Sequence, residues 1–468
     1  MASRSVGPGH EPYNSGATTV RVAMQAVEAA QRAGASDAEA WLSTGHSAAV
    51  RVRDGNVDER IDVESGTLAL RVFSGSRTAT AMTTDLHLDG LARLADDAVA
   101  LARLTDPDPY AGLPEGPFPA TGESHSLELV DPALVDPAPD LLLSLAHRVD
   151  AAARSLDPRV RSGEGATATR WAGTTALANS RGMASSYEAT TCSLWASAAA
   201  DDAGGKKREG WWYAADRRLA GMEDAETVGR TAAERTRRQL GSRPVPTQEG
   251  PVVWAPEAAR SFLSILARAA AGDARYLGSS FLIDREGEQL ASPLVTISDD
   301  ATLPGRLGSR PFDAEGVVSQ QTPLFAKGVF AGFLFDAYSG RKAGRPSTAN
   351  AGRSSFRGGS RIEVGPSNLV MSPGESSPEV IIRGVKRGLY LTDMLGFGEN
   401  LTTGDFSRGA AGFWIEDGEL AFPVGEINIA GRLPEMLSNI DAVGNDLSVV
   451  ETAGAPTFRI AQMMISGR

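Results

Sequence analysis

The chain has 468 residues, of which 42% are hydrophobic and 22% are charged, and its formal net charge is −12. This length allows two or three domains with a sizeable core, and the composition excludes a disordered or membrane-embedded chain. The acidic balance argues against a general nucleic-acid-binding protein, and the single cysteine excludes an internal disulfide. Because no secretory signal and no run of about 18–20 apolar residues is present, we expect a cytoplasmic protein that does not enter a membrane.

The first predicted element is a tail, because residues 1–18 are rich in glycine, serine and proline and are expected to be disordered. From Thr19, apolar residues recur at helical spacing until Gly34 provides a stop. Alternating residues at 50–53 and 68–72 predict strands, and a helix is expected over 86–104. Proline and glycine are then frequent over 106–123, which predicts a long loop or a sub-boundary.

A further helix is expected from about residue 140, followed by strands over 161–213 and a charged helix over 225–240. The segment GSRPVPTQEG at 241–250 is the clearest domain boundary. Beyond it we predict a short strand at 251–254 and a helix that Pro256 opens and that ends near residue 271. The remainder is glycine-rich with short β segments. The chain is therefore predicted to be α+β, with an N-terminal α/β region over 19–242 and a β-rich C-terminal domain over 243–468.

No metal site is visible in the histidine spacing. A helical zinc site needs two histidines about one turn apart, so that both rings reach the same ion. No two of the five histidines lie within ten residues of each other, and all five fall in the first third of the chain: His10, His46, His87, His125 and His147. Surface or turn positions are the simpler interpretation of each.

Two candidate nucleophiles have weak support. Cys192 would share a strand face with Leu194 and Ala196, which favours a small buried hydrophobic residue over a catalytic thiol. Ser339 and Lys342 match a Ser-x-x-Lys pattern in which the lysine could activate the serine. Gly340 between them does not favour the helical turn that would hold the pair, and the accompanying Lys-Thr-Gly element is absent.

One short cluster, KKREGWWY at 206–213, places basic residues beside aromatic ones, as in sites for single-stranded nucleic acid. In an acidic protein, a hairpin with a solvated charged tip and core-facing tryptophans is the better interpretation. The residues alone therefore supply no complete catalytic site.

The C-terminal half carries a set of motifs that resembles the TldD/PmbA family. The most specific stretch is TGDFSRGAAGFWIEDG at 403–418, and FPVGEINIAG at 422–431 and VGND at 443–446 continue it. Two further segments, PFDAEGV at 311–317 and YSGRK at 338–342, also match. The resemblance extends from about Thr19 to the C-terminus, with weaker motifs in the N-terminal region.

The resemblance implies a specific comparison on one helix. The TldD branch is similar to a zinc metallopeptidase in which a His-Glu-x-x-x-His helix supplies two ligands and a base, and a C-terminal cysteine supplies a third ligand. With GD at 272–273 as the anchor, the histidine positions fall at Leu263 and Arg268 and the glutamate at Ser264. None of these three residues suits its role, and the C-terminal tail has no cysteine. We expect the Arg268 guanidinium to repel a divalent cation.

This pattern resembles the PmbA (TldE) branch, which implies a non-catalytic subunit that binds no cofactor and pairs with a zinc-bearing TldD-like partner. The resemblance further implies a heterodimer that encloses a chamber for short or unfolded peptides or peptide-derived metabolites. Within the glycine-rich segment 403–412 and just after it, Asp405, Arg408, Phe413 and Trp414 are candidate chamber or partner contacts; turns inside the β core are the other interpretation of this segment. Two alternatives stay open, a stand-alone peptide-binding scaffold homodimer and a serine-type amide hydrolase that uses Ser339 and Lys342.

Overall fold

The computed structural model describes residues 16–118, 127–353 and 361–467. Its N-terminal part is one six-stranded antiparallel sheet in the order β3-β2-β1-β4-β5-β6. The strands are β1 (Asp37–Arg53), β2 (Asn56–Ser74), β3 (Arg77–Thr83), β4 (Val160–Asn179), β5 (Ala184–Asp201) and β6 (Lys207–Asp216). The helices are α1 (Gly16–Arg32), α2 (Leu88–Leu104), α3 (Pro132–Val135), α4 (Leu141–Ser155) and α5 (Ala225–Arg238).

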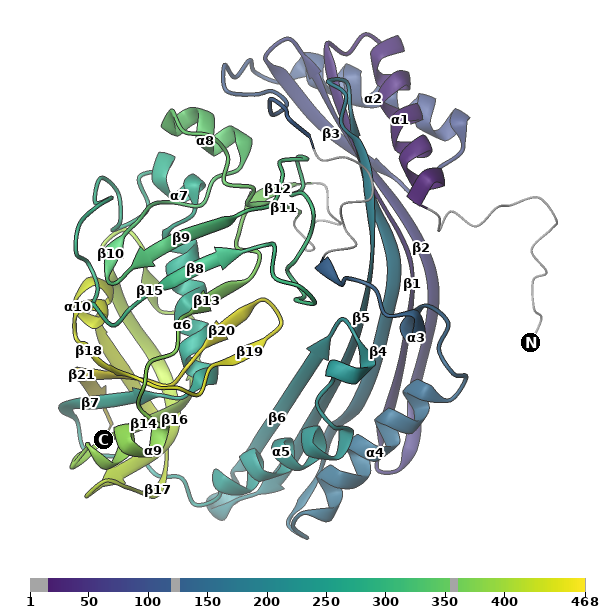
Figure 1. Cartoon of the computed structure of the whole chain (residues 1–468). Helices are drawn as coiled ribbons and strands as arrows, with labels where there is room; N and C mark the ends of the chain where they lie inside the picture. Colours follow the sequence, from purple (N-terminus) through teal and green to yellow (C-terminus); the bar gives the residue numbers. More distant parts are fainter. Residues whose placement is uncertain (1–15, 119–126, 354–360, 468) are drawn as a thin grey trace.

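The two faces of this sheet have different neighbours because strand side chains alternate. On one face α1 and α2 pack on Ala40 and Leu42 of β1, and α4 and α5 pack on the other half of the sheet. The opposite face carries Glu39 and Trp41 and contacts the C-terminal part, where Trp41 packs beside Phe312. Figure 1 shows the long curved sheet with its helices on the side away from the C-terminal part.

The C-terminal part contains a sheet that closes on itself, because β14 pairs with both β7 and β16. Its ring of strands is β7 (Gln248–Trp254), β21 (Phe458–Ser466), β17 (Glu419–Arg432), β16 (Asp405–Glu416) and β14 (Arg387–Leu395), with β15 (Glu399–Asn400) and β18 (Ile440–Val443) beside it. A second sheet contains β8 (Ile297–Asp300), β9 (Gln321–Ala326), β10 (Val329–Phe330), β13 (Leu369–Met371), β19 (Ser448–Val450) and β20 (Ala453–Ala455), and β11 (Ala351–Arg353) pairs with β12 (Ile362–Val364).

Helix α6 (Pro256–Ala269) connects the closed sheet to the rest of the C-terminal core. Pro256 occupies the first turn, where its missing N–H has no intrahelical partner to lose. Phe262 of α6 packs on Trp254, which is stacked on Phe458 with ring centroids 5.5 Å apart. The other helices of this part are α7 (Gly272–Tyr276), α8 (Ala337–Ala343), α9 (Pro378–Arg383) and α10 (Leu433–Ser438).

The predicted α+β architecture is confirmed, and two details differ from the expectation. Helix α1 begins at Gly16, so residues 16–18 are helical and not part of a tail, while residues 1–15 lie outside the described chain. Strands β1 and β2 are 17 and 19 residues long, far longer than the alternating stretches predicted. Of the loop predicted over 106–123, residues 119–123 lie outside the described chain. No helix in the described ranges is long and apolar enough to cross a membrane.

Candidate functional site

Three adjoining cavities lie along α6 and α7; the outer two have lining residues from both the N-terminal sheet and the C-terminal part, and the central one is lined by the C-terminal part alone. The aromatic cavity, about 410 Å³, is lined by Trp195, Trp211, Trp212 and Tyr213, and the central cavity, about 510 Å³, includes Arg268, Leu277 and Leu401. The polar cavity, about 490 Å³, includes Arg71, Tyr276 and Tyr338. Ser264 and Ala453 line both the aromatic and central cavities, and Asp273 and Val364 line both the central and polar cavities. The three cavities therefore form one groove.

The hairpin of β5 and β6 supplies the aromatic wall of this groove, and of the two tryptophans predicted to face the core, Trp212 does so and Trp211 does not. Trp211 is more than half exposed and lines the aromatic cavity. Trp212 is half-buried against the core under α4 and α5, and its indole N–H donates to Glu223 at 2.9 Å. Lys206, Lys207 and Glu209 at the tip are exposed, as expected, whereas Arg208 is largely buried and paired with Asp202.

Of the three α6 residues that align with the zinc motif, only Ser264 and Arg268 face the groove. Leu263 is completely buried in the hydrophobic core, so its side chain points away from the cavities. Ser264 and Arg268 are exposed and line the central cavity, and the Ser264 hydroxyl donates to the Arg260 carbonyl at 3.2 Å. A core leucine, a hydroxyl engaged with its own helix and a guanidinium do not form a zinc site. The residues present therefore do not fit the metal that the family implies.

Arg268 belongs to a charged cluster that no motif in the chain predicts. It forms an ion pair with Oε1 of Glu399, whose Oε2 accepts from Nε and Nη2 of Arg408 at 2.8 and 2.7 Å. Burial raises the pKa of Glu399, but hydrogen bonds from the Gly398 amide and from both arginines outweigh it and lower the pKa below its usual value. Glu399 is therefore ionised at neutral pH. We refer to Arg268, Glu399 and Arg408 as the arginine–glutamate cluster.

The other candidate contacts on β16 are spread over different surroundings. Asp405 is exposed and accepts from the Thr403 hydroxyl at 2.6 Å, and Phe413 is half-buried. Trp414 is buried in the hydrophobic core, which corrects its assignment as a contact, because a side chain without exposed surface supports the fold. In the described part of the chain, none of Asp405, Phe413 and Trp414 lines the three cavities. Arg408 does not line them either; it bonds to Glu399, whose other carboxylate oxygen pairs with the groove residue Arg268.

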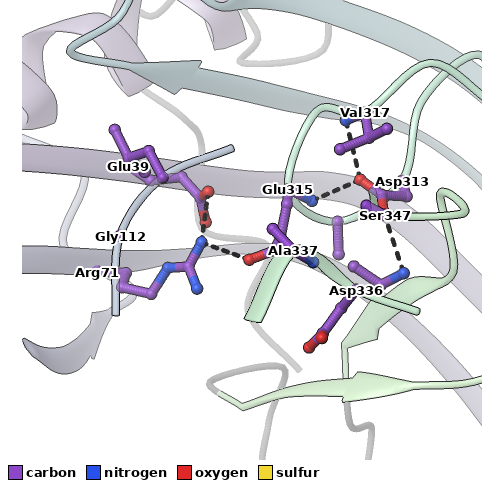
Figure 2. Close-up of polar contacts among 12 residues, drawn as sticks. Glu39, Arg71, Gly112, Asp313, Glu315, Val317, Asp336, Ala337 and Ser347 are labelled. Carbon is purple, nitrogen blue, oxygen red and sulfur yellow. Dashed lines mark hydrogen bonds and ion pairs between the residues drawn. The ribbon is translucent and has the colours of Figure 1, made fainter. Parts of the chain in front are cut away.

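The matched segment at 311–317 builds a buried polar network between the two parts of the chain. Nη2 of Arg71 donates to Glu39 and to Glu315, both at 2.9 Å, and Nη2 of Arg353 donates to the other oxygen of Glu39 at 2.7 Å. Glu315 also accepts from the Ala337 amide at 2.7 Å. Figure 2 shows the carboxylates of Glu39 and Glu315 on either side of the Arg71 guanidinium. The network holds the sheet and the C-terminal part in a fixed relation beside the polar cavity.

Asp313 lies behind this network and is expected to make folding pH-dependent. Burial, followed by the charge of Glu315, raises its pKa to about 7, although Arg310 and the amides of Glu315 and Val317 act in the opposite direction. Because the pKa is raised in the folded state, the folded chain binds this proton more tightly than the unfolded chain. The stability that Asp313 contributes is therefore complete below about pH 4 and is lost as the pH rises to about 7.

This prediction is checked by urea unfolding of the wild type and Asp313→Asn at several pH values between about 5 and 8. Asparagine cannot ionise, and it places an amide N–H₂ among backbone donors, so it should lower stability at every pH. The advantage of the wild type over the variant should shrink as the pH rises. A constant or growing advantage would show that Asp313 is already ionised at low pH.

Ser339 and Lys342 lie on one helix, α8, although Gly340 between them was not expected to favour a helical turn. Gly340 is required there because a Cβ would lie 2.8 Å from the Arg345 carbonyl oxygen. The Ser339 hydroxyl donates to Asp336 at 2.6 Å in a capping box at the start of the helix. The Lys342 ammonium lies over the rings of Tyr276 and Tyr338, 4.5 and 5.0 Å from their centroids. These contacts give Ser339 a capping role and place the lysine against aromatic rings.

The same helix holds the loop that follows α2. The Tyr338 hydroxyl donates to Asp108 at 2.7 Å. Arg341 donates to the carbonyls of Tyr110 at 2.7 Å and Gly112 at 2.8 Å. We refer to these as the α8–loop contacts; they tie the N-terminal part to the C-terminal part at the polar end of the groove.

Cys192 is expected to be unreactive in the folded protein. Its thiol is buried on the strand face that carries Leu194 and Ala196, and burial, then Asp131 and Asp216, raise its pKa to about 11. Since the thiolate is the reactive form, a disulfide reagent at about pH 8 should label one equivalent only after unfolding in guanidinium. Rapid labelling of the native chain would contradict this placement.

Three family models match successive parts of the chain: PmbA/TldA metallopeptidase domain 1 at residues 38–102, the central domain at 132–240 and the C-terminal domain at 247–467. Metalloprotease PmbA of Escherichia coli O157:H7 is 34% identical over 436 residues, which cover 93% of both chains. A Bacteroides thetaiotaomicron structure described as a candidate modulator of DNA gyrase matches with a TM-score of 0.87 and 25% identity, over 97% of this chain and 100% of its own. TldE of Thermococcus kodakarensis shares the fold, with a TM-score of 0.85 and 22% identity over 95% of this chain and 100% of its own.

Proposed function

The chain belongs to the PmbA/TldD metallopeptidase family, and on this premise we propose that it is a non-catalytic subunit that pairs with a zinc-bearing TldD-type partner. In the proposed heterodimer the partner hydrolyses short or unfolded peptides or peptide-derived metabolites. This chain supplies a wall of the chamber in which they bind. We also propose a cytoplasmic location and a domain boundary at 242/243, which is supported by the packing of Val245 in the C-terminal core.

The observation that carries the proposal is the chemistry of the exposed face of α6. Where the family's catalytic branch places ligands and a base, this chain has Ser264 and Arg268, and Leu263 is in the core. Over the residues that the structure describes, no three His, Cys, Asp or Glu side chains gather in a group that could hold a metal ion. The Arg268 guanidinium is paired with Glu399 and has no lone pair to offer an ion.

The surface next to the arginine–glutamate cluster supports a protein partner. Phe397 is 92% exposed at the turn between β14 and β15, and Leu395 beside it is also exposed. The Arg408 guanidinium lies 5.5 Å from the centroid of the Phe397 ring. A large aromatic side chain that is almost fully exposed favours an interface, because burying it on association releases apolar surface from water.

The proposal is tested by producing the chain alone and together with a TldD-type subunit from the same genome. We expect the lone chain to bind no stoichiometric zinc and to lack peptidase activity, and the co-purified pair to have both. A Phe397→Ser variant should weaken the pairing, while its own unfolding midpoint stays unchanged because the side chain contributes little to the fold. Val380→Ser, at an exposed position on α9 away from the cluster, serves as the control.

Three outcomes would contradict the proposal. Zinc and peptidase activity in the pure lone chain would make it an enzyme in its own right. A stable homodimer that binds peptide and ignores the TldD-type subunit would favour the scaffold alternative. Labelling of Ser339 by a serine-reactive probe, lost in Lys342→Ala, would favour the amide hydrolase.

A further inference from the structure

We infer that the central cavity binds the C-terminal carboxylate of a peptide, with Arg268 as its cationic partner and an apolar last side chain in the cavity. The inference deepens the proposed function and rests on it for the class of ligand. It assigns to the non-catalytic subunit a site that recognises which end of a peptide enters the groove.

The arginine–glutamate cluster carries more positive than negative charge. Two guanidinium groups share one carboxylate, and Glu399 is only 3% exposed and ionised. Arg408, which is nearly buried, takes Oε2 with two donors, whereas Arg268 takes Oε1 with one. The cluster therefore carries one surplus positive charge, and its exposed portion is the Arg268 side chain, which is 52% exposed.

Arg268 keeps N–H groups that can donate to a ligand. In the described part of the chain its Nη2 bonds to Glu399, and Nε and Nη1 have no hydrogen-bond partner. Nη2 has a second N–H, which together with the N–H of a neighbouring nitrogen can give a carboxylate two parallel bonds, and such bonds are stronger than neutral ones. Glu399 holds the guanidinium in place, so less side-chain entropy is lost when a ligand binds.

The lining of the central cavity suits an apolar side chain beside one carboxylate. Leu277, Leu369, Leu401 and Val364 give it a mainly apolar wall, which suits an aliphatic or aromatic side chain. Asp273 is the acidic residue in the lining, and one of its oxygens accepts from the Ala274 amide. Its charge disfavours a second acidic group on the ligand. A peptide end with one carboxylate and an apolar side chain matches this combination.

The central cavity continues into the aromatic cavity. Ser264 and Ala453 line both the central and the aromatic cavity, so a chain anchored by its carboxylate at Arg268 continues past Ser264 toward Trp211 and Tyr213. Aromatic rings accept many side chains without sequence preference. The site therefore selects the peptide terminus and tolerates the sequence before it.

The test measures binding of fluorescein-labelled GSGSAL peptide to the full chain alone by fluorescence anisotropy. The label is on the N-terminus, and the peptide is compared as the free acid and as the C-terminal amide. We expect the acid to bind about tenfold more tightly, as for one hydrogen-bonded charged contact. Arg268→Gln should bind the acid about as weakly as the amide, and Arg268→Lys should keep a preference for the acid.

Two further variants separate the roles of charge and apolar surface. Leu277→Ala should weaken binding of both forms and leave their ratio unchanged; Leu277 is 67% exposed, so its removal should not affect folding. Arg285→Gln, a surface arginine paired with Glu288 outside the groove, is the matched control and should change nothing. Circular dichroism of each variant checks that it is folded.

Equal affinity for the acid and the amide, or an unchanged preference in Arg268→Gln, overturns the inference. The outcome is distinguishable from failure of the proposed function. If the pair with a TldD-type subunit is an active zinc peptidase but the lone chain shows no acid preference, only the carboxylate site is wrong. If the lone chain prefers the acid and also hydrolyses it with bound zinc, only the non-catalytic assignment is wrong.

Discussion

Replacing Glu315 by alanine should lower the free energy of unfolding by about 3–5 kcal/mol, the range found when one partner of a buried ion pair is removed. Glu315 is fully buried and accepts from Arg71 and from the Ala337 amide at the start of α8. Its loss leaves the Arg71 guanidinium with a single acidic partner, Glu39, which Arg353 shares. Urea unfolding followed by tryptophan fluorescence measures the change.

The control for Glu315→Ala is a pair of the same chemistry at the surface. Arg161 and Asp201 form a two-point ion pair at 2.8 and 3.1 Å, and both side chains are exposed. Because water screens exposed charges, Asp201→Ala should leave the unfolding midpoint unchanged. If Glu315→Ala were as mild as the control, the network would not be what holds the sheet against the C-terminal part.

Replacing Gly412 by alanine should destabilise the chain by about 3 kcal/mol. Gly412 lies in β16, opposite Leu391 of β14 and Val424 of β17. A Cβ at this position would overlap the Tyr390 carbonyl oxygen at less than 3.0 Å, and that oxygen belongs to backbone that cannot rotate away. Thermal unfolding monitored by circular dichroism is a sufficient measurement.

Gly365→Ala is the matched control, because nothing lies within 4 Å of a Cβ built there and its φ is not in the left-handed region. It should leave the melting temperature unchanged. If Gly412→Ala left the melting temperature unchanged, β14 and β16 would be able to separate locally. That result would favour the prediction that the 403–412 segment contacts the chamber or the partner. In the structure, this glycine lets two strands of the closed sheet approach each other.

Much of the fold was predictable because its signals are local. Pro256 marks the start of α6, and the helices before and after the first pair of strands follow their apolar spacing. The length of β2 was not predicted, although Val57, Ile61 and Val63 alternate with polar residues. Asn56–Ser65 is exposed, so no core packs on this half of the strand, and its pairing with β1 determines it. The helix through Gly340 was missed because glycine has a low helix propensity. Propensity takes no account of the Arg345 carbonyl oxygen, which lies so close to this position that only glycine fits.

The candidate site was predictable only where a single helix carries it. Arg268 was found by aligning α6, but Glu399 is 131 residues away in the chain and has no motif of its own, so nothing in the sequence paired the two. The position of Leu263 in the zinc motif could be found by alignment. Whether its side chain faces the groove or the core depends on how α6 packs against the closed sheet. Trp414 shows the converse, because a residue in the most specific motif proved to be core.

The α8–loop contacts have a mechanical consequence. At the aromatic end of the groove, the chain between α5 and β7 joins the two walls. At the polar end, Tyr338 and Arg341 of α8 join them by hydrogen bonds to the loop after α2. Figure 1 shows α5 and α8 toward opposite ends of the space between the two parts. Because both ends of the groove are held by contacts, the distance between its walls stays constant and the walls do not close on a ligand. The width of the groove is set when the chain folds, so the thickness of an incoming molecule decides its admission before any specific contact forms.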